Sequence, residues 1–166
     1  YFVSNYPPYG FWSSDAVPGT LDSLKAPPDD QVPLGVYMHI PFCRQRCHFC
    51  YFKVYTGKSA KDVDAYMRAM AREAKLFSEL PRFAGRKPRF LYLGGGTPSY
   101  ISQEQFQQFM VELQEIFPMD AVEEFTLECE PGTVSLEKLK AFKHAGVTRA
   151  SLGVEHFDDH VLAINN

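Results

Sequence analysis

The chain has 166 residues, of which 45% are hydrophobic, and a net charge of -3, which suits one domain with a buried core. The negative balance without a dense basic run argues against nucleic acid as the main partner, and the absence of a membrane-spanning apolar stretch or signal peptide argues against a membrane. Three of the four cysteines crowd into one short loop, so we expect a cytoplasmic protein in a reducing compartment rather than a disulfide framework.

Residues 1–33 contain six prolines and six aromatic residues without a helical or strand period. Prolines at this density interrupt regular secondary structure. We predict an irregular N-terminal arm, laid across the surface of the following domain, with its aromatic side chains packed there. A proline-rich recognition motif is the alternative.

From residue 34 onward, strand patterns alternate with helix patterns. Strands are predicted over residues 36–40, 90–93, 125–129 and 149–154. Apolar residues at helical spacing predict helices that begin near Ser59, Ser102 and Ser135, and a fourth that begins at Asp158. Such alternation implies a parallel sheet with right-handed crossovers, and functional residues gather at the carboxyl ends of such strands.

The most informative motif follows the first predicted strand, where Cys43, Cys47 and Cys50 have the spacing C-x3-C-x2-C. Thiolates hold iron–sulfur clusters, and three thiolates on a cubane cluster leave one of its four irons open to a small molecule. A structural zinc site and three unrelated thiols are the alternatives, but zinc favours paired spacings that this chain lacks. Cys129 stands alone in an apolar alternating run and is interpreted as a core thiol.

The residues around the cysteines extend the motif. The run from Val36 to Cys43, with the cysteine triad behind it, resembles the first strand and cluster loop of radical S-adenosylmethionine (radical SAM) enzymes. It is similar in particular to the oxygen-independent coproporphyrinogen III oxidase-like family. Further runs resemble the next strand ends of that family in the same order: Gly94–Ser99, Thr126–Pro131 and Ser151–Phe157.

The family's core is a (β/α) barrel of six strands. The resemblance therefore implies an α/β fold in which residues 34–166 form the N-terminal part of a radical SAM core, incomplete at its C-terminus. About four β-α units of a partial barrel would follow the arm of residues 1–33.

By the same resemblance, the three cysteines bind a [4Fe-4S] cluster whose fourth iron is chelated by S-adenosylmethionine (SAM). An electron from a flavodoxin, a ferredoxin or a reductase then cleaves SAM to methionine and a 5′-deoxyadenosyl radical. No catalytic side chain is assigned. The positions that contact the cofactor in the family correspond here to Tyr37, Phe49, Gly95, Gly96, Thr97, Glu128 and Glu155.

Two positions depart from the family pattern. Glu155 stands where relatives often carry Gln, so a side chain that only accepts hydrogen bonds replaces one that also donates. Phe52 stands where the oxidase that decarboxylates coproporphyrinogen III has a further cysteine. The resemblance implies an oxidoreductase of porphyrin and heme biosynthesis that acts on a tetrapyrrole. A methyltransferase using two SAM molecules, a cyclopropane-forming enzyme and a non-catalytic heme chaperone remain alternatives.

Overall fold

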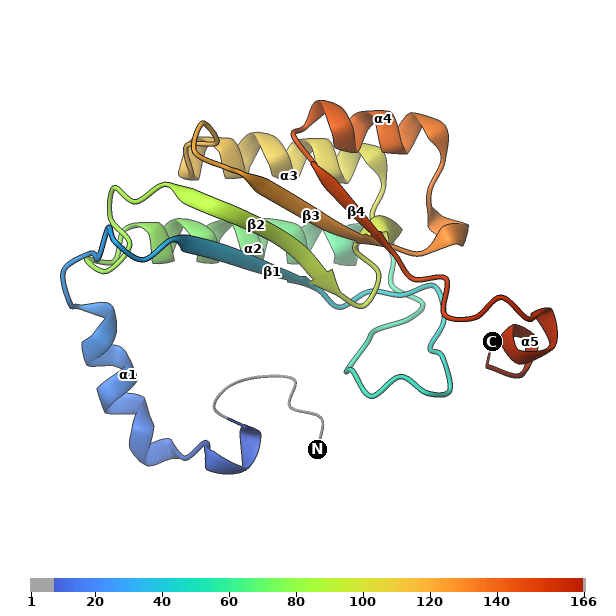
Figure 1. The fold of residues 1–166 in the computed structure, drawn as a ribbon, viewed down its shortest axis with the longest axis horizontal. Coiled ribbons are helices and arrows are strands. Elements are labelled where there is room, and N and C mark those ends of the chain that lie inside the picture. The colour runs from blue at the N-terminus through green and yellow to red at the C-terminus, as the bar shows by residue number, and fades with distance from the viewer. Residues whose placement is uncertain (1–7, 166) are drawn as a thin grey trace.

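The computed structural model describes residues 8–165, and its centre is a parallel sheet of four strands in the order β1-β2-β3-β4 (Figure 1). The predicted α/β fold is confirmed, and each strand lies within two residues of its expected bounds. The strands are β1 (Leu34–Ile40), β2 (Pro88–Gly95), β3 (Glu124–Cys129) and β4 (Arg149–Leu152). Sequential strands are neighbours because each is joined to the next by a helical crossover.

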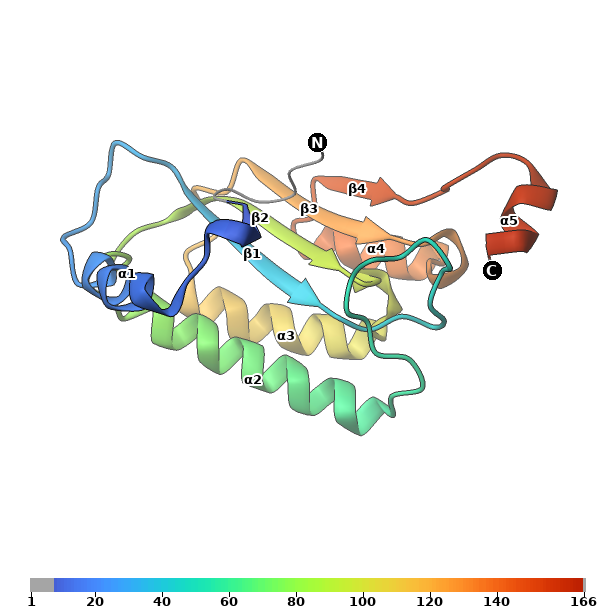
Figure 2. The ribbon, with the colours of Figure 1, turned by 90° about the horizontal axis from the view of Figure 1, so that it is seen from below.

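Three helices link the strands and cover one face of the sheet (Figures 1 and 2). Capping boxes fix the starts of the first two helices. In each, the side chain of the serine before the helix accepts from the amide of the third helical residue, and the side chain of that third residue accepts from the serine amide. The serines are Ser59 and Ser102, as predicted. The helices are α2 (Ala60–Ser78), α3 (Gln103–Ile116) and α4 (Leu136–His144), and α5 (Asp159–Asn165) follows β4.

The hydrophobic core lies between the sheet and these helices. Alternate residues of the strands point toward the helices, and Ile40, Leu93 and Leu127 are fully buried there. From the helices, Phe106 of α3 and Phe142 of α4 meet edge-on, with ring centroids 4.7 Å apart. This packing fixes the sheet as a rigid platform for the loops at its carboxyl end.

The opposite face of the sheet carries polar and aromatic side chains. Register partners form a row across all four strands: Tyr37, Tyr92, Thr126 and Arg149. The Tyr37 and Tyr92 rings lie 5.8 Å apart, and the Arg149 guanidinium donates to the Thr126 hydroxyl at 3.0 Å. Helices α2, α3 and α4 all lie on the other side (Figure 2). This face is therefore chemically suited to polar ligands rather than to core packing.

The N-terminal arm is less irregular than predicted. Residues Val17–Leu24 form a helix, α1, whose second residue is Pro18. Proline is tolerated in the first turn of a helix because its missing amide would have no intrahelical acceptor there. The arm is held by Arg82, whose amide donates to the Leu24 carbonyl and whose guanidinium donates to the Pro27 carbonyl.

The aromatic side chains of the arm do not pack as predicted. Tyr9, Phe11 and Trp12 are 77%, 79% and 57% exposed, and Tyr9 and Trp12 contact each other with centroids 5.6 Å apart. The described arm extends beside the sheet rather than across it (Figure 1). The remaining aromatics, Tyr1, Phe2 and Tyr6, lie outside the described residues. Among the described helices, none is long and apolar enough to cross a membrane.

Replacing Phe106 by Ala tests the core. We expect the free energy of unfolding to fall by about 3–5 kcal/mol, because the change leaves a cavity against Phe142. Val111→Ala on the same helix is the matched control, since Val111 is 54% exposed and should change stability by less than about 1 kcal/mol. Urea denaturation followed by circular dichroism measures both, and equal losses would contradict the core described above.

Candidate functional site

The cysteine loop leaves the carboxyl end of β1 and is closed at its base by backbone hydrogen bonds. The Tyr55 amide donates to the Pro41 carbonyl at 2.7 Å, and the Cys43 amide donates to the Tyr55 carbonyl at 3.2 Å. Farther along, the Cys50 amide donates to the Cys47 carbonyl at 3.1 Å, forming a turn between these two cysteines. The first cysteine is thus anchored at the base, and the other two share one turn.

The glycine run at the end of β2 packs directly against this loop. The Gly96 amide donates to the Ile40 carbonyl and the Thr97 amide to the Phe42 carbonyl, both at 2.8 Å. A Cβ on Gly96 would lie 2.9 Å from the Cys43 sulfur and 2.9 Å from the Phe42 oxygen, closer than real Cβ atoms approach. The Thr97 hydroxyl also donates to that sulfur at 3.4 Å. The close approach therefore requires glycine at this position.

Glu128, near the carboxyl end of β3, is held by two donors from β2. The Tyr92 hydroxyl donates to Oε1 at 2.6 Å, and the Gly95 amide donates to Oε2 at 2.9 Å. The hydrogen bond to Glu128, with burial, raises the pKa of Tyr92 to about 12. The hydroxyl therefore remains a donor at neutral pH. Each carboxylate oxygen can still accept a further hydrogen bond from a ligand.

A pocket of about 410 Å³ opens between the cysteine loop, the glycine run and the ends of β3 and β4. It brings together most of the residues that the sequence singled out. Cys47 lies outside the lining, on the loop between the other two cysteines. The predicted residues in the lining are Cys43, Phe49, Cys50, Gly95, Gly96, Thr97, Glu128 and Glu155.

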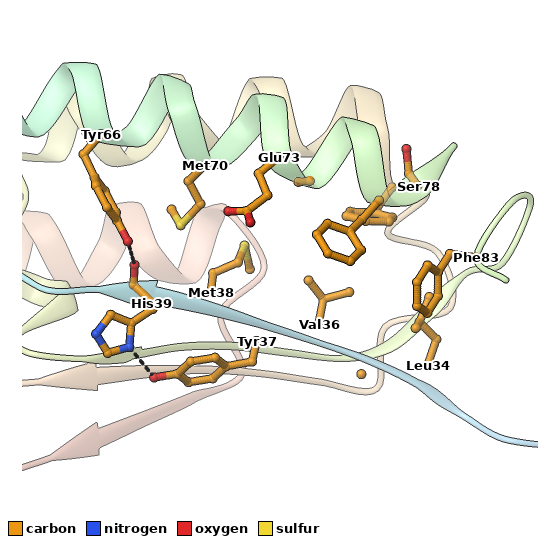
Figure 3. A pocket seen from close by; sticks show the side chains of 14 residues that line it. Leu34, Val36, Tyr37, Met38, His39, Tyr66, Met70, Glu73, Ser78 and Phe83 are labelled. Atoms are coloured by element: carbon orange, nitrogen blue, oxygen red, sulfur yellow. Dashed lines mark hydrogen bonds between the residues drawn. The ribbon is translucent and has the colours of Figure 1, made fainter. Parts of the chain in front are cut away.

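Tyr37 lines a different pocket, of about 330 Å³, along the outer edge of β1 (Figure 3). Its hydroxyl pairs with Nδ1 of His39 at 2.9 Å, and the Tyr66 hydroxyl donates to the His39 carbonyl at 2.8 Å. A Cβ on Gly94 would lie 3.1 Å from the Tyr37 ring and 3.1 Å from Glu128 Oε2. Burial, followed by the charge of Glu128, raises the pKa of Tyr37. Tyr37 therefore lies outside the cysteine pocket but near Glu128, which lines it.

Glu155 reaches the pocket through an unusual backbone conformation. Its φ is 63°, in the left-handed region that residues with a Cβ adopt at a cost of about 1–2 kcal/mol. One carboxylate oxygen lies 2.8 Å from where a Cβ on Gly153 would stand, so glycine there leaves room for it. Backbone strain of this kind clusters at functional sites.

The cysteine thiols lie in a partly desolvated, electronegative setting. Burial raises the pKa of Cys43 and of Cys47, and the nearby charges of Cys50 and Glu130 raise both further. Bound cations would offset the repulsion between the cysteine thiolates and the neighbouring negative charges. Within residues 8–165, no group of three or more His, Cys, Asp or Glu side chains is arranged around a single metal ion. The C-x3-C-x2-C spacing lacks the paired ligands typical of structural zinc and is compatible with a cubane, whose cysteines bind separate irons.

Two supporting residues were not predicted. Tyr92 could have been found, because strand alternation places it on the same face of β2 as Gly94, beside Glu128. No local sequence pattern indicates a role for Lys138 of α4, because its partner is distant in the chain. Its ammonium group donates to the Ser99 carbonyl at 2.5 Å, next to the glycine run. The Ser99 hydroxyl in turn accepts from the Glu130 amide at 3.0 Å, so Lys138 braces the floor of the pocket.

A comparison with protein families decides the assignment. The model of the radical SAM superfamily matches residues 37–166, which include every cysteine and every other predicted site residue. The chain belongs to the radical SAM superfamily. Radical SAM proteins use a [4Fe-4S] cluster and SAM, and both fit a pocket lined by two cysteines of the loop (Cys43 and Cys50), glycine backbone and three glutamates, with Cys47 beside it on the same loop.

Among radical SAM relatives, the chain is 37% identical over 129 residues to the heme chaperone HemW of Bacillus subtilis, covering 77% of this chain and 33% of that protein. It is 34% identical over 134 residues to the oxygen-independent coproporphyrinogen III oxidase of Escherichia coli, covering 81% and 29%. The solved structure of coproporphyrinogen III oxidase (HemN) from Escherichia coli superposes with a TM-score of 0.83 and 31% identity, over 99% of this chain and 37% of that one. The chain spans about a third of these relatives.

Replacing Gly96 by Ala tests the contact between the glycine run and the first cysteine. A methyl group there would displace the Cys43 sulfur or the Phe42 carbonyl, so we expect iron content after anaerobic reconstitution to fall at least severalfold. Gly132→Ala is the matched control, because its Cβ would meet nothing closer than 3.9 Å. Iron analysis and the visible absorbance of the cluster measure both variants. Normal iron content in Gly96→Ala would contradict the geometry.

Proposed function

We propose that Cys43, Cys47 and Cys50 bind three irons of a [4Fe-4S] cluster and that the adjoining pocket binds SAM. The observation that carries the proposal is the meeting of the cysteine loop and the glycine run at the carboxyl end of a parallel sheet, beside Glu128. When bound and reduced, this cofactor pair supplies a 5′-deoxyadenosyl radical. The chain's own residues bind the pair, orient it and exclude water.

The pocket offers a distinct role to each remaining residue. The backbone of Gly95, Gly96 and Thr97 presents polar groups without side chains and suits the methionine end of SAM. Glu128, fixed by two donors, suits the ribose hydroxyls, and Phe49 suits the adenine ring. We assign Glu155 a contact with the cofactor. Tyr37 acts beside Glu128 at the edge of the site.

For the substrate, we propose a tetrapyrrole, because relatives of both kinds carry names that refer to coproporphyrinogen or heme. The favoured reaction is oxidative decarboxylation of coproporphyrinogen III, with a ferredoxin, flavodoxin or reductase as electron donor. Methyl transfer with a second SAM and cyclopropane formation are less favoured. The protein would work in the cytoplasm, where free thiols stay reduced.

A heme carrier is the second candidate. It is favoured by the 37% identity to HemW and by Phe52, which lines the pocket at the position where the oxidase carries a further cysteine by the resemblance. Incubation of the complete protein with coproporphyrinogen III, SAM and dithionite separates the two. Loss of two carboxyl groups by mass spectrometry supports the oxidase, whereas tight heme binding with background SAM cleavage supports the carrier.

Single replacements of Cys43, Cys47 and Cys50 by Ala should each abolish the cluster and the production of 5′-deoxyadenosine. Cys129→Ala is the matched control: this thiol is 5% exposed and donates to the Leu127 carbonyl within the core, so its loss should leave the cluster in place. Anaerobic reconstitution followed by iron and sulfide analysis provides the measurement. An intact cluster in all three loop variants would refute the ligand set.

Replacing Tyr92 by Phe should weaken SAM binding by about two- to tenfold, because Glu128 loses one of its two fixed donors. Since the pKa of Tyr92 is raised to about 12, the hydroxyl is protonated at neutral pH and the loss should be constant from about pH 7 to about pH 9. The contribution of the raised Tyr92 pKa to the free energy of unfolding is fully present below about pH 10 and is lost as the pH rises toward 12. Equilibrium dialysis with labelled SAM provides the measurement, and Tyr9→Phe in the exposed arm is the control.

A further inference from the structure

We propose that Lys53, Tyr55 and Lys58, here called the lysine face, form the docking site for an acidic one-electron carrier protein. The inference rests on the proposed function, because a radical SAM cluster takes its electron from outside the chain. It adds where that partner binds and which chemistry recognises it.

The cysteine loop differs in charge from the rest of the chain. Residues 43–61 contain five lysines and arginines and no acidic residue, whereas the chain as a whole has a net charge of -3. The first acid after the loop, Asp62, is engaged in the N-cap of α2, where it accepts from Ser59. The ion pairs among the described residues involve other cations. The loop therefore carries a local positive field on a negative protein.

Two of the five cations are turned toward backbone. The Arg44 guanidinium donates to the Gly132 carbonyl at 3.2 Å, and the Arg46 guanidinium donates to the Cys50 carbonyl at 2.9 Å. By contrast, the ammonium groups of Lys53 and Lys58 both lie over a single ring, that of Tyr55, at 5.8 and 5.6 Å from its centroid.

The lysine face lies outside the lining of the cofactor pocket. Phe52 and Val54 line that pocket, whereas Lys53 and Tyr55, which alternate with them along the chain, do not. Tyr55 is 41% exposed, and both lysines are exposed. Cations that recognised carboxylates of a small substrate would be expected in the lining. Their position outside the lining favours a macromolecular partner of opposite charge.

The face is also directly connected to the first cluster ligand. Tyr55 accepts from the Cys43 amide at 3.2 Å and donates its own amide to Pro41 at 2.7 Å. A carrier protein bound over the Tyr55 ring would therefore contact the loop next to the two backbone hydrogen bonds that hold Cys43 in place. Positive charge around an exposed aromatic ring suits brief, salt-sensitive complexes with an acidic partner, which electron transfer requires.

The test compares Lys53→Glu/Lys58→Glu with Arg72→Glu/Lys140→Glu, which makes the same charge change at exposed positions within α2 and α4. The complete protein, with its cluster reconstituted, is reduced either by a photoreduced acidic [2Fe-2S] ferredoxin or by dithionite. Bleaching of cluster absorbance gives the rate. At low salt we expect about a tenfold slower reduction by ferredoxin for the lysine-face variant alone, with unchanged reduction by dithionite.

The expected difference should shrink as salt is added, and Lys53→Arg/Lys58→Arg should reduce at the wild-type rate with ferredoxin. Equal ferredoxin rates in both glutamate variants would overturn the docking site, as would a slower reaction with dithionite. A raised KM for the tetrapyrrole with normal ferredoxin rates would reassign the lysines to substrate carboxylates. A wild-type protein without a dithionite-reducible cluster would overturn the proposed function itself.

Discussion

The site depends on a single close approach, in which the backbone of Gly96 lies against the end of β1. Two 2.8 Å hydrogen bonds, from Gly96 to Ile40 and from Thr97 to Phe42, continue the β1–β2 pairing beyond the strands and into the loops. The contact is possible because no Cβ stands between the glycine and the Cys43 sulfur. The position of the first cysteine is thereby set by its contacts with the sheet as well as by the loop that carries it.

The same principle extends across the sheet. Glu128 of β3 accepts from Tyr92 and Gly95 of β2, so the carboxylate is fixed relative to the glycine run. Lys138 and Ser99 brace the pocket from the helical side. Groups that would touch different parts of a cofactor are therefore held by one rigid parallel sheet, and little reorganisation is needed when the cofactor binds.

Much of this architecture could be predicted from the sequence because its determinants are local. Capping boxes at Ser59 and Ser102 mark helix starts, and apolar strands ending in glycine or cysteine runs mark the sheet. Features that depend on tertiary context were missed. Helix α1 spans eight residues, contains proline and glycine, and was too short to show a period. The edge pocket beside Tyr37 follows from the outer position of β1, which sequence periodicity does not specify.

The contact between the cysteine loop and α5 bears on the order of assembly. The Nδ1–H of His48 donates to the Ile164 carbonyl at 3.0 Å, and the His48 amide donates to the Asn165 carbonyl at 3.4 Å. The two ends of this contact are more than a hundred residues apart, so on the ribosome the loop emerges long before its partner. A cluster delivered during synthesis would meet a loop still lacking this support. The cysteine loop therefore gains this support only once β4 and α5 have folded into place.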